Sequence, residues 1–174
     1  TANQYPYTAM NHNWSSFFPL WAREGGPQKF LAILKDPAMR GKIRDDKDFH
    51  TWALEHGGWE GIVLGRARQP QNKKYEGMRL SEIAKARGDE DPANTAITMM
   101  AEEGGSITGM FHTMSEDDVR LVMRQPWVAI ASDGSAINLA EEGVPHPRNF
   151  STNPRVLGHY VREKKLLSLE EAVR

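Results

Sequence analysis

A short apolar strand leads directly into a polar turn at residues 127–135, which read Trp-Val-Ala-Ile-Ala-Ser-Asp-Gly-Ser. An uninterrupted apolar strand of this length is typical of a parallel strand that helices cover. In α/β proteins, reactive side chains gather beyond the carboxyl ends of such strands. The stretch therefore predicts an α/β chain, with Asp133 at the place where chemistry is expected.

Helix and strand patterns alternate on the amino-terminal side of this stretch. The clearest helix begins at Asp91-Pro92, repeats small and apolar residues at helical spacing, and ends at Gly104-Gly105. The helix that begins at Ser115 is capped by Asp118 and should bury Val119, Val122 and Met123. Further helices are predicted over 27–34, from Asp36-Pro37, over 46–55, 80–87 and from 168, with strands over 61–65 and 106–111. Residues 3–26 favour a structured loop, and we expect helices to outnumber three or four short, mostly parallel strands.

Composition excludes several classes of protein. The 174 residues carry 22 basic and 23 acidic side chains, so the net charge of −1 gives no support to nucleic-acid binding. With no cysteine, disulfide scaffolds and zinc–thiolate sites are absent. No apolar run approaches the ~20 residues of a membrane span, and no signal peptide is visible. We therefore expect a cytoplasmic protein without a membrane partner. Because the chain begins at Thr1 and stops at Arg174 within a helical pattern, we expect it to be a fragment.

Two residues are the candidates for chemistry. Asp133 could ligate a metal or accept a proton from a bound water, although Asp-Gly is also a common turn pair. Arg148, in Pro145-His146-Pro147-Arg148, could grip a carboxylate with two hydrogen bonds, or be a surface residue of a proline-rich loop. His146 could be a ligand or a proton carrier, but a single loop histidine is more often neither. The histidine spacing shows no metal motif, so no metal ligand is predicted in this chain.

Several stretches, taken in order, resemble the N-acyl-D-amino-acid deacylases (D-aminoacylases) of the amidohydrolase superfamily. They are residues 5–9 (Tyr-Pro-Tyr-Thr-Ala), 19–26 (Pro-Leu-Trp-Ala-Arg-Glu-Gly-Gly), 115–119, 132–134, 145–158 and 167–174. Each motif alone is weak, but the motifs agree with the family in order and spacing, and this agreement is specific and covers nearly the whole chain. The resemblance implies the later, C-terminal catalytic portion of a (β/α)8 barrel. Residues 1–174 would be one fragment of that barrel domain, with a largely helical insertion or lid over 27–110.

The resemblance also implies roles for individual residues. Asp133 matches the aspartate that takes a proton from the zinc-activated water and passes it to the leaving amine. Arg148 matches the arginine that binds the substrate carboxylate, assisted by Tyr5. Asn11 stands where the family often has a serine as a further carboxylate contact. The family's zinc ligands precede the start of this chain.

Three functions remain open at this level. The first is zinc-dependent hydrolysis of N-acyl-D-amino acids. The second is another amidohydrolase activity on a cyclic or linear C–N bond, and Arg148 discriminates between the two because it would bind a free carboxylate. The third is an inactive binding or interaction fragment, since the metal ligands are missing. The expected partner is a small N-acyl amino acid, alongside a homo-oligomer or the missing N-terminal half.

Overall fold

The computed structural model describes residues 2–138, 140 and 143–173. The chain divides into two compact units. The first combines the chain up to Ala9 with the chain from Met114 onward, and the second is Met10–Thr113. Strands β1 (Ala2–Gln4) and β5 (Val128–Ile130) both lie in the first unit. Between these two strands, the chain passes through the whole of the second unit.

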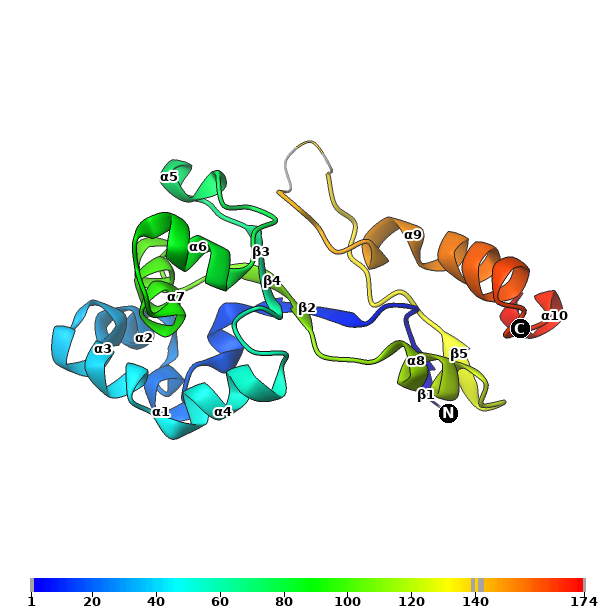
Figure 1. Ribbon diagram of the computed structural model, residues 1–174, viewed down its shortest axis with the longest axis horizontal. Coiled ribbons are helices and arrows are strands. Elements are labelled where there is room, and N and C mark those ends of the chain that lie inside the picture. The colour runs from blue at the N-terminus through cyan, green and yellow to red at the C-terminus, as the bar shows by residue number, and fades with distance from the viewer. Residues whose placement is uncertain (1, 139, 141–142, 174) are drawn as a thin grey trace. The chain divides into compact units, whose positions relative to one another are not determined.

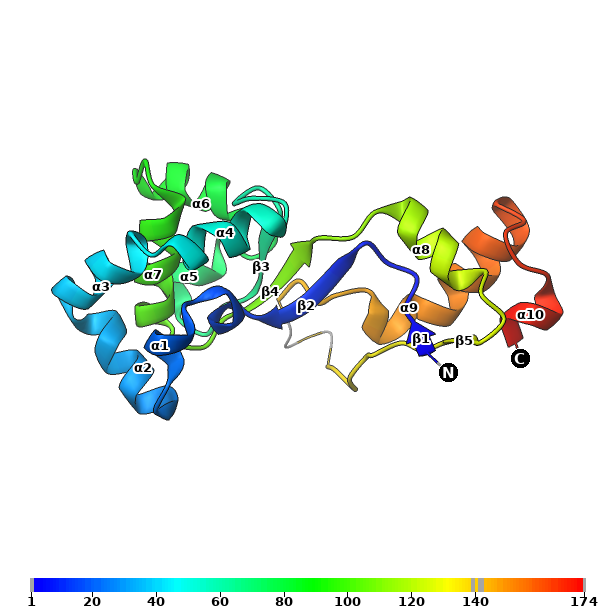
Figure 2. The ribbon, with the colours of Figure 1, turned by 90° about the horizontal axis from the view of Figure 1, so that it is seen from below.

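Parallel pairing of β1 with β5 organises the first unit. Ala2 pairs with Val128, and Gln4 pairs with Ile130. Helix α8 (Glu116–Met123) packs beside both strands (Figures 1 and 2). The Gln4 side-chain amide donates to the Val119 carbonyl at 3.2 Å. This arrangement confirms the helix capped by Ser115 and a strand within 128–131. The expectation that this strand is buried was wrong, because Ala129 is exposed and Val128 and Ile130 are half-buried.

Helix α9 (Arg148–Arg155) continues into a π-helical segment, η2 (Val156–Glu163), and α10 (Leu169–Val173) follows. Buried Tyr160 of η2 packs with Val119 and Met123 of α8 as a small core, and its hydroxyl donates to Glu116 at 2.9 Å. Helix α8 and the η2 segment are therefore joined by apolar packing and by a hydrogen bond to a carboxylate.

The second unit has a three-stranded sheet in the order β2 (Ala9–Asn13), β4 (Thr108–His112), β3 (Ile62–Arg66). Strands β3 and β4 are antiparallel. The sheet is accompanied by the short 3-10 helix η1 and by seven α-helices among the described residues (Figure 1). These are η1 (Trp14–Phe17), α1 (Leu20–Arg23), α2 (Gly26–Lys35), α3 (Pro37–Arg44), α4 (Lys47–Glu55), α5 (Pro70–Lys73), α6 (Leu80–Arg87) and α7 (Pro92–Glu102).

Aromatic side chains fill the core of the second unit. Phe17 stacks against Phe49 with ring centroids 5.6 Å apart, and meets Phe111 edge-on at 6.1 Å. Trp14 is completely buried beside them. Trp14, Phe17 and Phe18 therefore lie in the core of this unit.

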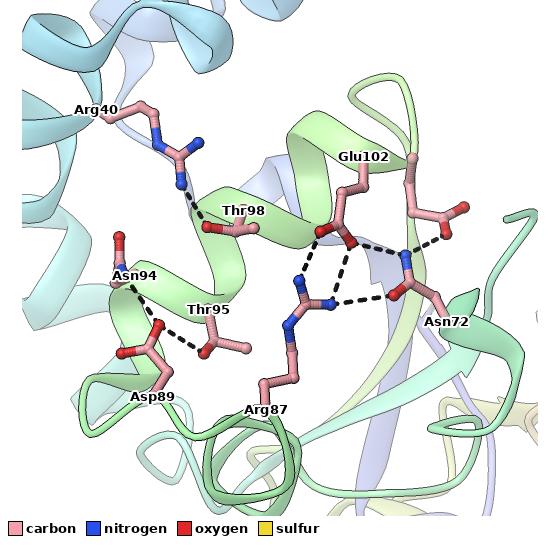
Figure 3. Close-up of polar contacts among 9 residues, drawn as sticks. Arg40, Asn72, Arg87, Asp89, Asn94, Thr95, Thr98 and Glu102 are labelled. Carbon is pink, nitrogen blue, oxygen red and sulfur yellow. Dashed lines mark hydrogen bonds and ion pairs between the residues drawn. The ribbon is translucent and has the colours of Figure 1, made fainter.

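A polar cluster joins α5, α6 and α7 (Figure 3). Arg87 forms an ion pair with Glu102 at 2.5 Å, and Asn72 donates to Glu102 at 3.0 Å. Buried Glu103 accepts from the backbone amides of Arg68 and Gln69 and from Asn72. Every buried carboxylate oxygen needs such donors, and these hold the chain after β3 against the end of α7.

Three further predictions were wrong. Residues 3–26 are not a loop, because they contain parts of β1 and β2 together with η1 and α1. Among the described residues there are five strands, and β3 and β4 pair antiparallel, which the sequence did not indicate because an alternation of helix and strand patterns carries no information on strand direction. Val122 is 37% exposed, since it lies at the edge of the face on which Val119 and Met123 are buried.

Candidate active site

The turn after β5 carries Asp133 in a left-handed conformation, with φ of 49°. Aspartate tolerates this conformation better than most residues. The turn lies tightly against the start of α9: a Cβ atom at Gly134 would come within 3.0 Å of the Arg148 carbonyl oxygen. The Ser135 amide also donates to the Asn149 side chain at 2.9 Å. Glycine at 134 and these contacts therefore bring Asp133 to α9.

Arg148 forms an ion pair with Asp133, with Nη1 2.9 Å from the carboxylate. The Arg148 side chain is 13% exposed and that of Asp133 is 67% exposed. The Nε atom of Arg148 is buried and has no hydrogen-bond partner among the described residues. Arg148 therefore holds the Asp133 carboxylate at the surface, while its own buried Nε–H makes no hydrogen bond to the described residues.

Arg148 is the first residue of α9, not part of a proline-rich loop, which corrects the alternative reading of this segment. Proline at 147 suits a helix start because it has no N–H to satisfy there. Pro154 lies inside the same helix, and a proline there removes one helical hydrogen bond. One proline before this short helix and one inside it explain why the sequence pattern did not predict the helix.

Tyr5 follows β1 directly, as Asp133 follows β5, so both lie beyond the carboxyl ends of paired parallel strands. The Arg148 guanidinium lies over the Tyr5 ring, 5.3 Å from its centroid. Burial raises the pKa of the Tyr5 hydroxyl above its ordinary value of 10.0, and the charge of Arg148 offsets this only in part. Tyr5 is therefore a neutral hydroxyl at physiological pH and can donate a hydrogen bond.

A pocket of about 480 Å³ opens beside these residues. Tyr5 and Asp133 line it, and Arg148 contacts both. The remaining lining residues are Asn3, Gln4, Met114, Asp118, Val119, Val122 and Ala131. This volume suits a small organic molecule with an apolar part and a charged end.

A larger hollow of about 720 Å³ lies elsewhere in the first unit. It is lined mainly by 123–130 and by residues of η2 and α10, including Trp127, Val156 and Leu167. It contains none of the predicted site residues. We therefore place the candidate site at the smaller pocket, where the titratable groups meet.

From the sequence, His146 was a loop histidine without a specific role, and the structure places it beneath the site, in contact with Tyr5 and Arg148 but outside the pocket lining. Its side chain is 1% exposed. Its ring meets Tyr7 edge-on at 5.1 Å, and one of its nitrogens accepts from the Arg148 amide at 3.0 Å. The only sequence signal was its position two residues before Arg148.

Asn11 lies in β2 within the second unit and is partly exposed. The structure brings Tyr5, Asp133 and Arg148 together in the first unit, and Asn11 belongs to the second unit. Among residues 2–138, 140 and 143–173, no three histidine, aspartate or glutamate side chains gather to hold a metal ion. Within the same ranges, no helix is both long and apolar enough to cross a bilayer.

Comparison with curated proteins finds relatives from Alcaligenes xylosoxydans xylosoxydans. The chain is 37% identical over 97 residues to an N-acyl-D-glutamate deacylase, which covers 56% of this chain and 18% of that protein. It is 36% identical over 100 residues to a D-aminoacylase, covering 58% of this chain and 19% of that protein. The chain thus spans about a fifth of the length of these relatives. No protein-family model matches it.

Solved structures give the same result for the fold. The N-acyl-D-glutamate deacylase of Bordetella bronchiseptica, complexed with zinc and a phosphonate inhibitor, matches 98% of this chain and 26% of that chain, with a TM-score of 0.61 and 22% identity. A D-aminoacylase described with a binuclear metal centre matches over the same shares, with a TM-score of 0.59 and 26% identity.

In fold, the chain is a helix-rich α/β segment similar to part of these D-aminoacylases, and a further similar structure, at 25% identity and a TM-score of 0.57, is described as defining a subset of the amidohydrolases. More particularly, they confirm the resemblance to N-acyl-D-amino-acid deacylases that the sequence motifs indicated.

Proposed function

We propose that this chain is the later catalytic portion of a zinc-dependent hydrolase that cleaves the amide bond of N-acyl-D-amino acids. The observation that carries the proposal is the meeting of Asp133, Arg148 and Tyr5 beyond the paired strands β1 and β5. The relatives, named as deacylases of N-acyl-D-glutamate and of D-amino acids, support the substrate class.

In this proposal Arg148 binds the substrate carboxylate. Its Nη1 is engaged by Asp133, and its buried Nε is a donor without a partner among the described residues. Arginine to carboxylate pairs are strong because both partners are charged and two bonds can form. Tyr5, whose hydroxyl stays protonated, adds a neutral donor from the other strand.

Asp133 serves as the proton carrier. It accepts a proton from the attacking water as the water oxygen bonds to the acyl carbon, and it returns that proton to the amide nitrogen as the C–N bond breaks. Its 67% exposed carboxylate, at the edge of the pocket, is accessible to both water and substrate.

Zinc is described in a solved neighbour, and a zinc ion lowers the pKa of a bound water so that hydroxide forms near neutral pH. The described residues supply no three-ligand group, so in this proposal the ligands come from outside the chain. The isolated chain is accordingly proposed to be inactive.

We further infer that the second unit is an insertion into the barrel. The sequence predicted such an insertion over 27–110, and the chain forms a separate compact unit over Met10–Thr113. Its support is that β1 and β5 pair directly although the whole of that unit lies between them in the chain.

The proposed function is tested by assaying the complete protein, loaded with zinc, on N-acetyl-D-amino acids, their L-enantiomers and a cyclic amide that lacks a free carboxylate. The proposal predicts hydrolysis of the D-substrates alone. Hydrolysis of the cyclic amide in preference to the D-amino acid derivatives would instead support the alternative amidohydrolase activity.

A further inference from the structure

His146 is buried in the first unit, with two tyrosine rings packed against it. Only 1% of its surface is exposed. Its ring lies edge-on to Tyr5, with centroids 5.9 Å apart, and edge-on to Tyr7, with centroids 5.1 Å apart. The Tyr7 hydroxyl is itself fixed by a 2.7 Å hydrogen bond to Ser151 of α9. Burial against the two tyrosine rings therefore restricts the orientation of the imidazole.

Both ring nitrogens of His146 have partners of known polarity. Nε2 lies 2.8 Å from the carbonyl oxygen of Ala9, which can only accept, so Nε2 carries the proton. Nδ1 lies 3.0 Å from the backbone amide of Arg148, which can only donate, so Nδ1 is unprotonated. These two bonds together require the neutral imidazole with its proton on Nε2.

We propose that His146 is the positioning residue for Arg148. The Arg148 amide is the first N–H of α9, a group that has no acceptor within its own helix. His146 supplies that acceptor and is itself anchored on the Ala9 carbonyl. The imidazole thus connects the chain after β1 to the first residue of α9.

This connection determines where the guanidinium lies. Arg148 reaches both Asp133 at 2.9 Å and the face of Tyr5 at 5.3 Å, and small displacements of its backbone would carry it away from both. Displacements of about 1 Å at a site can reduce catalytic efficiency about 100-fold. Loss of the His146 contact should weaken binding of the substrate carboxylate, because Arg148 binds that group under the proposed function. The kinetic test of this inference therefore rests on the proposed function.

The test compares two substitutions in the complete, zinc-loaded protein. His146→Asn keeps an oxygen near the Nδ1 position, from which it can accept from the amide two residues later, as asparagine does in Asx turns. His146→Gln reaches toward the Ala9 carbonyl and loses the acceptor at the Nδ1 position. The substrates are an N-acetyl-D-amino acid and its carboxamide, which lacks the charged carboxylate.

We expect His146→Gln to raise KM for the acid about 10-fold or more, with kcat changed less than about 3-fold and the carboxamide unaffected. His146→Asn should restore KM for the acid to within about 3-fold of wild type. A purely structural role would lower kcat/KM for acid and carboxamide alike in both variants, and that result would overturn the proposal.

A second measurement does not depend on activity. In wild-type protein with ¹⁵N-labelled histidine, nuclear magnetic resonance at pH 8 should show His146 as the neutral form protonated at Nε2, with Nδ1 hydrogen-bonded to the Arg148 amide. Finding Nδ1 protonated would overturn the proposal. If this tautomer is found while wild type hydrolyses no N-acyl-D-amino acid, the proposed function fails and the His146 contact to Arg148 stands.

Discussion

Arg148 holds Asp133 in an ion pair of 2.9 Å in which the arginine side chain is 13% exposed and the aspartate side chain is 67% exposed. The pair exists because Gly134 lets the turn after β5 approach the backbone of α9, where a Cβ atom would lie within 3.0 Å of the Arg148 oxygen and of the Asn149 Cα. The guanidinium therefore orients the Asp133 carboxylate at the edge of the pocket, and its buried Nε has no hydrogen-bond partner among the described residues.

Asp133→Asn keeps the shape of the side chain and removes its basic site. Positioned proton transfer contributes about 10²–10⁴-fold to rate, so kcat of the complete enzyme should fall by that order. The KM should change little, because Arg148 and Tyr5 remain. Steady-state kinetics on an N-acetyl-D-amino acid measures both.

Asp118→Asn is the matched control, since Asp118 lines the same pocket and receives a hydrogen bond from Ser115 at 2.7 Å. Its kcat should stay within about 3-fold of wild type. An equal fall in both variants would mean that the pocket needs negative charge rather than a proton carrier at Asp133.

The isolated 174-residue chain should bind no stoichiometric zinc and show no deacylase activity. A catalytic zinc needs about three protein ligands in fixed geometry, and no such group occurs among the described residues. Elemental analysis after dialysis against zinc measures this. One tightly bound zinc per chain would show that the metal site lies here after all.

Glu102 should make the second unit sensitive to acid. Burial alone would raise the pKa of Glu102, but hydrogen bonds from Arg87 and Asn72 outweigh it, so the pKa lies below its ordinary value of 4.5 (Figure 3). Because the pKa is depressed in the folded state, the ionised form stabilises the fold above pH 4.5. That stabilisation is lost as the pH falls through the folded-state pKa.

Glu102→Gln should therefore lower the free energy of unfolding by about 1–3 kcal/mol at pH 7, and the difference from wild type should shrink below pH 4.5. Urea unfolding across this pH range measures it. Exposed Glu90 provides the control, since Glu90→Gln removes the same charge and should change little. A difference for Glu102→Gln that does not vary with pH would contradict the prediction.

Gly109→Ala should destabilise the second unit. A Cβ atom at this position in β4 would collide with the indole of fully buried Trp14 and lie 2.8 Å from the Val63 carbonyl oxygen. Overpacking of this kind costs about 1–3 kcal/mol. Gly41→Ala in α3 is the control: its Cβ meets nothing, so it should stabilise the helix by about 0.5–1 kcal/mol. Thermal unfolding that lowers Tm equally in both variants would refute this.

Helix boundaries were predictable where local chemistry sets them. Asp36 and Asp91 cap α3 and α7 by accepting backbone amides of the first turn, and each precedes a proline. By contrast, β1 reads Ala-Asn-Gln and has no strand pattern of its own. It is a strand because β5, distant in the chain, pairs with it, and no local pattern reports such a pairing.

The candidate site was partly predictable for the same reason. The position of Asp133 after an apolar strand followed from residues 128–133, and the roles of Arg148 and Tyr5 came from the family resemblance. The ion pair and the contact of His146 with Arg148 depend on how α9 packs against the turn after β5. Packing between segments distant in sequence leaves no spacing signal.

The substrate assignment depends most directly on Arg148. Removing a charge-assisted contact to a carboxylate should cost about 2–5 kcal/mol in kcat/KM. Arg148→Lys keeps the charge but loses the planar fork, so it should rescue only in part. Arg148→Met fills a similar space without charge.

The most direct test of the account measures kcat/KM of wild type and Arg148→Met on an N-acetyl-D-amino acid and on its carboxamide. Wild type should strongly prefer the acid, and Arg148→Met should nearly erase that preference while still hydrolysing the carboxamide. If Arg148→Met prefers the acid by the wild-type ratio, Arg148 does not bind the substrate carboxylate, and the proposed substrate class is contradicted.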